Sequence, residues 1–128
     1  MKYLTKEQIL LIHSIAIDET SGMHGVRDYH TILSLEELPR QKFGGKELYP
    51  TIFLKGAVYV KNILMSHPFI DGNKRTGMTA AFVFLENNGY KATAKEGEIE
   101  RFALRIIHDR LELQKIAEWL KRNSKKIK

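Results

Sequence analysis

The residues whose types suggest chemistry lie together near the middle of the chain, in the segment His67-Pro68-Phe69-Ile70-Asp71-Gly72-Asn73-Lys74-Arg75. A mainly apolar run, residues 78–85, follows almost at once and predicts a helix that is buried on nearly all sides. The first turn of a helix presents unpaired backbone N–H groups and the positive end of the helix dipole. The segment therefore predicts an anion-binding site, suited to phosphate, at the start of a core helix.

Four residues at the end of the segment suit phosphate binding. Gly72 can adopt a positive φ and lets the backbone approach a ligand closely. Asn73 could cap the helix or point its amide at an oxyanion. Lys74 and Arg75 put two cations where a phosphate would lie. These four residues are the candidate nucleotide-binding or phosphate-binding set.

A carboxylate and an imidazole complete the candidate site. Asp71 beside a phosphate would be a natural Mg²⁺ ligand, because Mg²⁺ takes one or two carboxylates together with phosphate oxygens. His67 is the one nearby group suited to take a proton near neutral pH. The residues alone leave a second interpretation open, in which the histidine is an ordinary loop residue and Lys74-Arg75 is solvated charge.

This segment resembles the signature of the Fic/Doc family, whose Fic branch reads His-x-Phe-x-(Asp/Glu)-Gly-Asn-Gly-Arg-x-x-Arg. Lys74 replaces the second glycine of that signature, and Met78 stands where its second arginine would be. Both departures are similar to the Doc branch, whose motif runs His-x-Phe-x-Asp-x-Asn-Lys-Arg. The stretches 25–28, 47–50 and 89–90 also look Doc-like, so the resemblance covers most of the chain.

The resemblance implies an activity and a role for each site residue. The Doc branch transfers the γ-phosphate of ATP to a threonine of elongation factor Tu, and so acts as a toxin that stops translation. For this chain it implies Mg²⁺- and ATP-dependent transfer to a serine or threonine hydroxyl of a protein. His67 would be the general base and Asp71 the Mg²⁺ ligand, while Lys74 and Arg75 would hold the phosphates during catalysis.

Two other functions compete with this one. The first is transfer of AMP, as in the Fic branch, which is disfavoured because Lys74 fills space that a glycine leaves open and Met78 supplies no second arginine. The second is a non-enzymatic module that binds nucleic acid, supported by the net charge of +6 and a basic C-terminus. Because the sequence contains no recognisable nucleic-acid motif, nucleic acid is an unlikely partner for the chain on its own.

An antitoxin is the expected partner. Family members that restrain themselves carry a helix reading (Ser/Thr)-x-x-x-Glu-(Gly/Asn), and the nearest match here, residues 93–97, is one residue too short. The resemblance therefore implies a separate, Phd-like antitoxin whose disordered C-terminal segment folds over the active-site groove. The net charge of +6 favours an acidic segment in that partner.

The composition indicates a cytoplasmic protein with one domain over residues 1–128. A chain of 128 residues with 43% hydrophobic residues can bury a real core. No apolar run approaches the ~20 residues of a membrane span, and the N-terminus lacks a signal-peptide pattern. Cysteine is absent, which excludes disulfides and thiolate chemistry.

The helical patterns predict an all-α fold, a compact bundle of about six helices around the buried helix of residues 73–88. Thr5-x-x-Gln8 fits a capping box for the first helix, whose apolar stripe would be Ile9, Ile12, Ile15 and Ala16. On this pattern His13 points elsewhere, to the surface. Gly22 would end the helix.

The remaining elements are predicted from stop and start signals. They are a short helix over 29–37 ended by Pro39, a helix from Pro50 to Ser66, the core helix closed by Gly89, a helix over 96–108 and a last helix capped by Asp109. Residues 40–47 form a loop that the family resemblance suggests is a flap near the active site. Residues 90–93 give no confident strand, and the basic C-terminal residues are expected to form a solvated, frayed tail.

Overall fold

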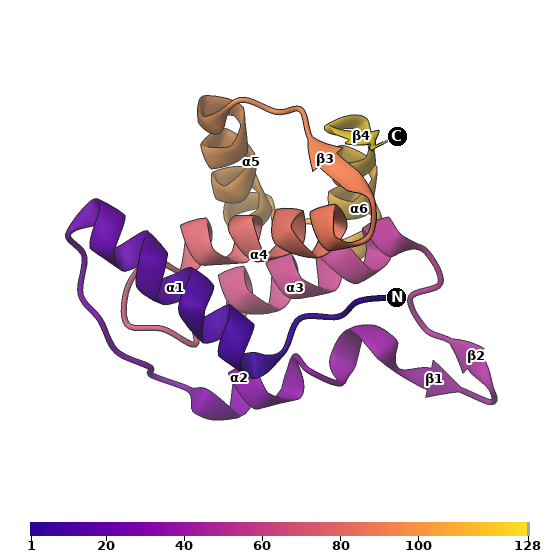
Figure 1. Cartoon of the computed structure of the whole chain (residues 1–128), viewed down its shortest axis with the longest axis horizontal. Coiled ribbons are helices and arrows are strands. Elements are labelled where there is room, and N and C mark those ends of the chain that lie inside the picture. The colour runs from indigo at the N-terminus through magenta and orange to yellow at the C-terminus, as the bar shows by residue number, and fades with distance from the viewer. Residues whose placement is uncertain (128) are drawn as a thin grey trace.

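Two helices that run in opposite directions form the centre of the molecule, α3 (Ile52–Ser66) and α4 (Asn73–Asn87) (Figure 1). The computed structural model describes residues 1–127 and has six α-helices in that range. Helix α1 (Lys6–Thr20) packs against α4, and α6 (Leu113–Arg122) packs against α3. Helix α5 (Glu96–Asp109) contacts both central helices, so the expected helical bundle around the 73–88 helix is confirmed.

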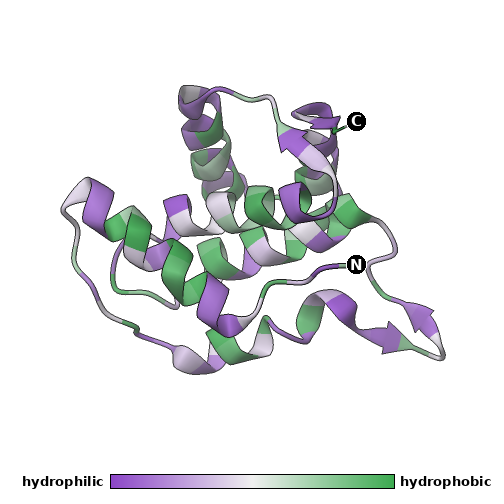
Figure 2. Ribbon diagram, viewed as in Figure 1, coloured by the Kyte–Doolittle hydropathy of each residue, from purple (hydrophilic) through white to green (hydrophobic). Residues whose placement is uncertain are grey.

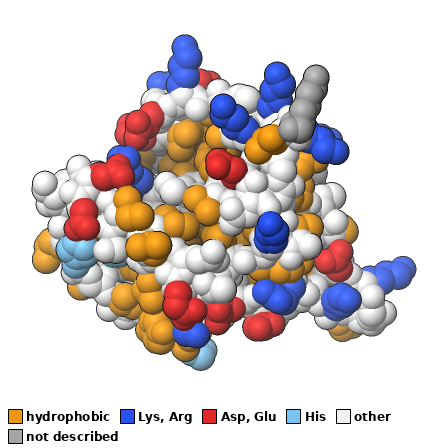
Figure 3. All heavy atoms as spheres, in the orientation of Figure 1, with side chains coloured by type: hydrophobic (Ala, Val, Ile, Leu, Met, Phe, Trp, Pro, Cys, Tyr) orange, Lys and Arg blue, Asp and Glu red, His pale blue; other side chains and the backbone are white. Residues whose placement is uncertain are grey.

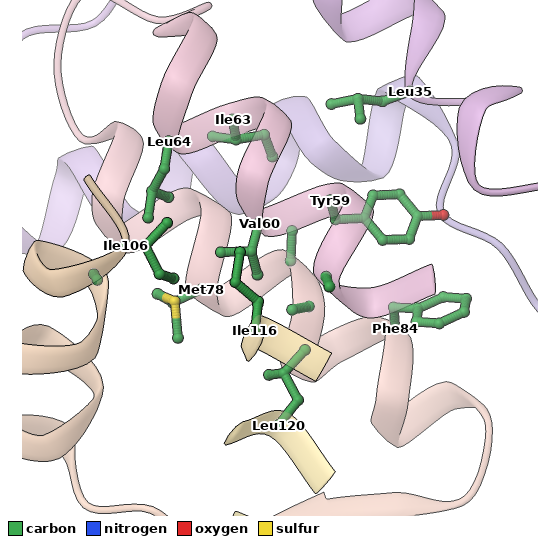
Figure 4. Packing of buried hydrophobic residues seen from close by; sticks show 14 of the residues in the cluster. Leu35, Tyr59, Val60, Ile63, Leu64, Met78, Phe84, Ile106, Ile116 and Leu120 are labelled. Atoms are coloured by element: carbon green, nitrogen blue, oxygen red, sulfur yellow. The ribbon is translucent and has the colours of Figure 1, made fainter. Parts of the chain in front are cut away.

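One hydrophobic cluster joins these helices. Figure 4 shows Val60 and Leu64 of α3, Met78 of α4, Ile106 of α5 and Ile116 of α6 converging on one another. Each of these side chains is at most 2% exposed. Burying a side chain of this size contributes about 1.5–3 kcal/mol, so the cluster fixes the orientation of α4 and of the loop that precedes it.

The chain end belongs to a small sheet rather than to a frayed tail. Strand β3 (Tyr90–Ala92) pairs antiparallel with β4 (Ser124–Lys126), and the two strands are mainly hydrophilic (Figure 2). Figure 3 shows lysine and arginine side chains gathered around this part of the surface. The prediction of a frayed tail is therefore wrong for Lys125 and Lys126, which lie in β4 with exposed side chains, while Lys121 and Arg122 end α6. Lys128 lies outside the described residues.

The 40–47 segment is a hairpin far from the candidate site. Strands β1 (Lys42–Phe43) and β2 (Lys46–Glu47) flank a two-glycine turn and lie beside the start of α3 (Figure 1). The candidate loop follows the other end of α3, and a 15-residue helix is about 22 Å long. The expectation of a flap beside the active site is therefore wrong, because the hairpin and the loop occupy opposite ends of the same helix.

Several predicted helix limits need correction. The short helix α2 (Tyr29–Ser34) ends before residue 37, and Pro39 lies inside a separate 3-10 turn, Leu38–Arg40. Helix α3 begins after Thr51, whose hydroxyl accepts the Leu54 N–H, and not at Pro50. Glu112 precedes α6, whereas Asp109 is the last residue of α5. A local side-chain cap thus decides where α3 begins.

A buried lysine attaches the hairpin to α3. The ammonium of Lys55 donates to the carboxylate of Glu47 at 2.9 Å and to the carbonyls of Tyr49 and Pro39 at 2.6 and 3.3 Å. The side chain of Lys55 is 1% exposed, so all three donors are used inside the protein. The hydrogen bond from Lys55 is the main cause that lowers the pKa of Glu47 below its ordinary value of 4.5.

Replacing Lys55 by methionine is expected to destabilise the protein, because two carbonyls and a carboxylate lose their donor. The expected loss is about 2 kcal/mol at pH 7, measured by urea unfolding. A depressed carboxyl pKa stabilises the fold above pH 4.5 and loses that contribution as the pH falls further, so the difference between the two proteins should shrink in acid. Lys61→Met on the same helix is the control. Equal stability of the two variants would contradict this role for Lys55.

Candidate active site

The loop that joins α3 to α4 starts at an unusual backbone position. Helix α3 ends at Ser66, as predicted, and His67 adopts a left-handed conformation with φ 48° and ψ 60°. The guanidinium of Arg27 donates to the carbonyls of Ser66 and His67, both at 2.9 Å. These bonds hold the backbone of His67, while the residue as a whole is exposed to solvent.

The segment after α1, residues 22–28, runs along this loop and is bonded to it. The N–H groups of Arg27 and Asp28 donate to the carbonyl of Pro68 at 2.7 and 2.9 Å. In the opposite direction, the Ile70 N–H donates to the carbonyl of Gly25 at 3.1 Å. The loop is therefore paired, strand-like, with a segment that lies about 40 residues earlier in the chain.

Asp71 is the best-defined carboxylate of the site. Its Oδ2 accepts the N–H of Met23 at 3.0 Å, and its Oδ1 accepts the N–H of Gly72 at 2.9 Å. These two bonds, the one from Met23 first, lower the pKa of Asp71 below its ordinary value. Asp71 is therefore ionised at neutral pH, and it remains exposed enough to meet a ligand.

Gly22 makes room for this carboxylate. The residue does not have a positive φ, and the helix end is formed instead by Ser21, which is left-handed with φ 56°. A Cβ atom built on Gly22 would lie 2.6 Å from Oδ2 of Asp71. The prediction that Gly22 ends the first helix is therefore wrong, since its lack of a side chain serves the approach of Asp71.

Asn73 closes the loop and does not cap the helix. Its side-chain oxygen accepts the Phe69 N–H at 3.0 Å, and its side-chain nitrogen donates to the Phe69 carbonyl at 2.9 Å. The residue that precedes α4 is Gly72, with φ 77°. The prediction that the Asn73 side chain caps the helix is thus wrong, while its predicted role toward an oxyanion stays a prediction. The Thr76 N–H donates to the Gly72 carbonyl. The backbone N–H of Asn73 lies before Thr76 in the first helical turn, whose N–H groups have no acceptor within the helix.

A cavity of about 620 Å³ opens beside the start of α4. Residues 71–75 form its polar side, and α1, α4 and α5 supply apolar side chains that include Met78, Phe82 and Ile99. In Figure 3 hydrophobic side chains are visible between α4 and α5, with acidic and basic side chains beside them. The structure thus brings Asp71, Gly72, Asn73, Lys74 and Arg75 to one cavity, whereas His67 is not among its lining residues.

Arg75 already has two carboxylate partners. Its guanidinium lies 2.8 Å from a carboxylate oxygen of Glu19 on α1 and 3.4 Å from one of Glu96 on α5. Glu96 falls within residues 93–97, the stretch that does not fit the inhibitory pattern. Both partners are exposed, so the pairs hold Arg75 at the cavity mouth without contributing much stability.

One buried residue beside the site, His13, was not predicted from the sequence. It is 4% exposed and its ring stacks on Phe69, so the prediction that it lies on the surface is wrong. The buried face of α1 consists of Ile9, His13, Ala16 and Ile17. That spacing of four, three and one is helical, and the predicted stripe is wrong at Ile15, which is 49% exposed.

The residues present fit a magnesium ion that shares its ligands with a nucleotide. Within residues 1–127 no group of three or more histidine or acidic side chains could hold a metal by itself. Asp71 supplies one ionised carboxylate next to two cations and free helical N–H groups. Mg²⁺ commonly binds in this way, through one or two carboxylates plus phosphate oxygens and water.

The fold and the site together define a helical protein with a polar loop that lines a cavity at the start of its central helix. A family model described as Fic/DOC family matches residues 3–85. The chain is 34% identical over 93 residues to "Toxin Doc" of Mycolicibacterium smegmatis, which covers 73% of this chain and 69% of that protein. It is 26% identical over 89 residues to "Protein kinase doc" of Escherichia phage P1, which covers 70% of each. The chain therefore belongs to the Fic/DOC family, in its Doc branch.

Substituting Gly22 by alanine is expected to displace the Asp71 carboxylate and to break its bond from Met23. Because that bond is the first cause of the lowered pKa, the pKa of Asp71 should rise toward its ordinary value of 3.8. Carbon-13 NMR titration of the Asp71 carboxyl measures the change. Gly97→Ala, in the first turn of α5, is the matched control, because a Cβ there would meet only the Arg101 side chain, at 3.5 Å, and it should leave the titration unchanged. An unaltered pKa in Gly22→Ala would contradict this account.

Proposed function

We propose that this protein is a Doc-type toxin that transfers the γ-phosphate of ATP to a serine or threonine hydroxyl of a protein. Elongation factor Tu is the expected target, and arrest of translation the expected consequence. The proposal rests on family membership and on the names of the two relatives, one a toxin and the other a protein kinase. An antitoxin with an acidic, Phd-like C-terminal segment would restrain the enzyme.

The observation that carries the proposal is the composition of the cavity wall. Asp71, Lys74 and Arg75 line one side of a cavity whose other side is largely apolar. Its volume of about 620 Å³ is in the usual range of small-molecule sites. A nucleotide has the same division, since its phosphates are charged and its base is a flat, weakly polar ring.

The proposed reaction is an in-line transfer. The oxygen of the target hydroxyl forms a bond to the γ-phosphorus while the bond to the β–γ bridging oxygen breaks, and ADP leaves with the electron pair. His67 accepts the hydroxyl proton. Lys74, Arg75 and the first N–H groups of α4 neutralise charge on the phosphates. Asp71 would hold Mg²⁺, which would help to offset the negative charge of the phosphates.

The exposure of His67 agrees with its role as the base. Because His67 does not line the cavity, the target hydroxyl would approach from the solvent side of the loop while the nucleotide occupies the cavity. Only a small part of the protein target would then have to enter the site. A catalytic base must come within hydrogen-bond reach of the proton it takes, and a side chain with few contacts can rotate to do so.

Incubation of the protein with ATP and a cell lysate should transfer the γ-label of ATP, and not the α-label, to a protein. His67→Ala should lower this transfer by at least ~10²-fold, because a general base is lost. His30→Ala, an exposed histidine on α2, is the matched control and should leave transfer unchanged. Transfer of the α-label would instead assign the AMP transferase activity of the Fic branch.

Lys74 is expected to select the γ-phosphate through its bulk and charge. Lys74→Gly should lose γ-phosphate transfer and gain little AMP transfer, because Met78 still stands where the Fic motif has an arginine. Lys74→Met keeps most of the bulk without the charge, and so separates the two effects. Mass spectrometry of the modified target distinguishes a phosphate from an adenylyl group. Full γ-phosphate transfer by both variants would show that Lys74 does not set the chemistry.

A further inference from the structure

A buried histidine outside the motif contacts two residues of the loop. His13 lies on the inner face of α1, and its ring centroid is 3.7 Å from that of Phe69, with 6° between the planes. Its Nε2 atom is 2.8 Å from the backbone carbonyl oxygen of Asp71. A carbonyl can only accept, so Nε2 carries the hydrogen in this contact.

This hydrogen bond reaches the Asp71 carboxylate through one peptide group. The carbonyl of Asp71 and the N–H of Gly72 belong to the same planar unit, so fixing one fixes the direction of the other. That N–H donates to Oδ1 of Asp71 at 2.9 Å. His13 therefore fixes the orientation of the Asp71–Gly72 peptide group, whose N–H donates one of the two backbone hydrogen bonds that the carboxylate accepts.

The close approach of α1 to the loop leaves little freedom for any other arrangement. A Cβ atom on Gly72 would lie 2.8 Å from Cδ1 of Ile17 and 3.8 Å from Cδ2 of His13. Rotation of the Asp71–Gly72 peptide would turn its carbonyl away from His13, leaving a buried imidazole N–H without an acceptor. Leaving a buried donor unpaired costs free energy, which favours the observed orientation.

We propose that His13 is a positioning residue that fixes the Asp71–Gly72 peptide plane and thereby aims the Asp71 carboxylate at the cavity. His13 is not among the cavity-lining residues, so it acts through Asp71 and does not touch the nucleotide. The proposal rests on the proposed function in so far as Asp71 is the Mg²⁺ ligand. Partners of this kind, which orient a metal ligand, typically change metal affinity or activity by about 10–100-fold when removed.

Two substitutions separate the hydrogen bond from the packing. His13→Phe keeps an aromatic ring over Phe69 but removes the donor. His13→Gln loses the ring but keeps an N–H donor of similar reach. His108→Phe, at the exposed end of α5, is the control for loss of a histidine elsewhere. Thermal unfolding of each variant reports the change in stability.

The first measurement needs no nucleotide or activity. The amide signals of Gly72 and Met23 in nitrogen-15 NMR spectra should move in His13→Phe and stay close to those of the unmodified protein in His13→Gln. The second measurement is the Mg²⁺ concentration that gives half-maximal transfer. It should rise about tenfold or more in His13→Phe, return to within about threefold in His13→Gln, and stay unchanged in the control.

Two outcomes would overturn the proposal. One is a folded His13→Phe protein with unmoved amide signals and an unchanged Mg²⁺ requirement. The other is that His13→Phe and His13→Gln move the signals equally and in proportion to their loss of stability, which would reduce His13 to a packing role. If the unmodified protein transfers no phosphate, the proposed function fails. The amide signals still decide whether His13 fixes the peptide plane.

Discussion

The loop between the two central helices owes its shape to hydrogen bonds from outside it, and the candidate site depends on that shape. Asn73 ties the start of α4 back to Phe69, and the 22–28 segment supplies donors to Pro68 and Asp71. All of these bonds join groups of the chain itself. The cost of ordering a loop is thus met during folding, so that less of it remains to oppose binding of an anion.

Features that depend on neighbours in the sequence were predictable. The capping box of α1, the end of α3 at Ser66 and the turn at Gly89 follow from residue types within a few positions of each other. The buried helix after the motif was also predictable, because an apolar run of that length is expected to lie in the core. The motif itself located the loop, since its residues are contiguous.

Features that depend on distant partners were not predictable from local patterns. Strand β3 exists because β4 pairs with it from more than 30 residues away, and neither stretch is strand-like alone. The structural role of Gly22 can be recognised only from its close contact with Asp71, which is distant in the sequence. The burial of His13 was indicated by its position, because it shares a helical stripe with Ile9 and Ala16. A buried polar residue needs a hydrogen-bond partner, however, and the neighbouring sequence contains none that explains its burial.

The charges around the cavity favour an anion only when a cation accompanies it. Asp71, Glu96 and Glu100 line the cavity and Glu19 pairs with Arg75, so four carboxylates face only two cations, Lys74 and Arg75. A phosphate group arriving alone would meet an excess of negative charge and would have to compete with Glu19 and Glu96 for the guanidinium. A divalent cation at Asp71 would cancel that excess. The electrostatics of this chain therefore favour entry of the proposed nucleotide as its magnesium complex, with Arg75 exchanging carboxylate oxygens for phosphate oxygens as it binds.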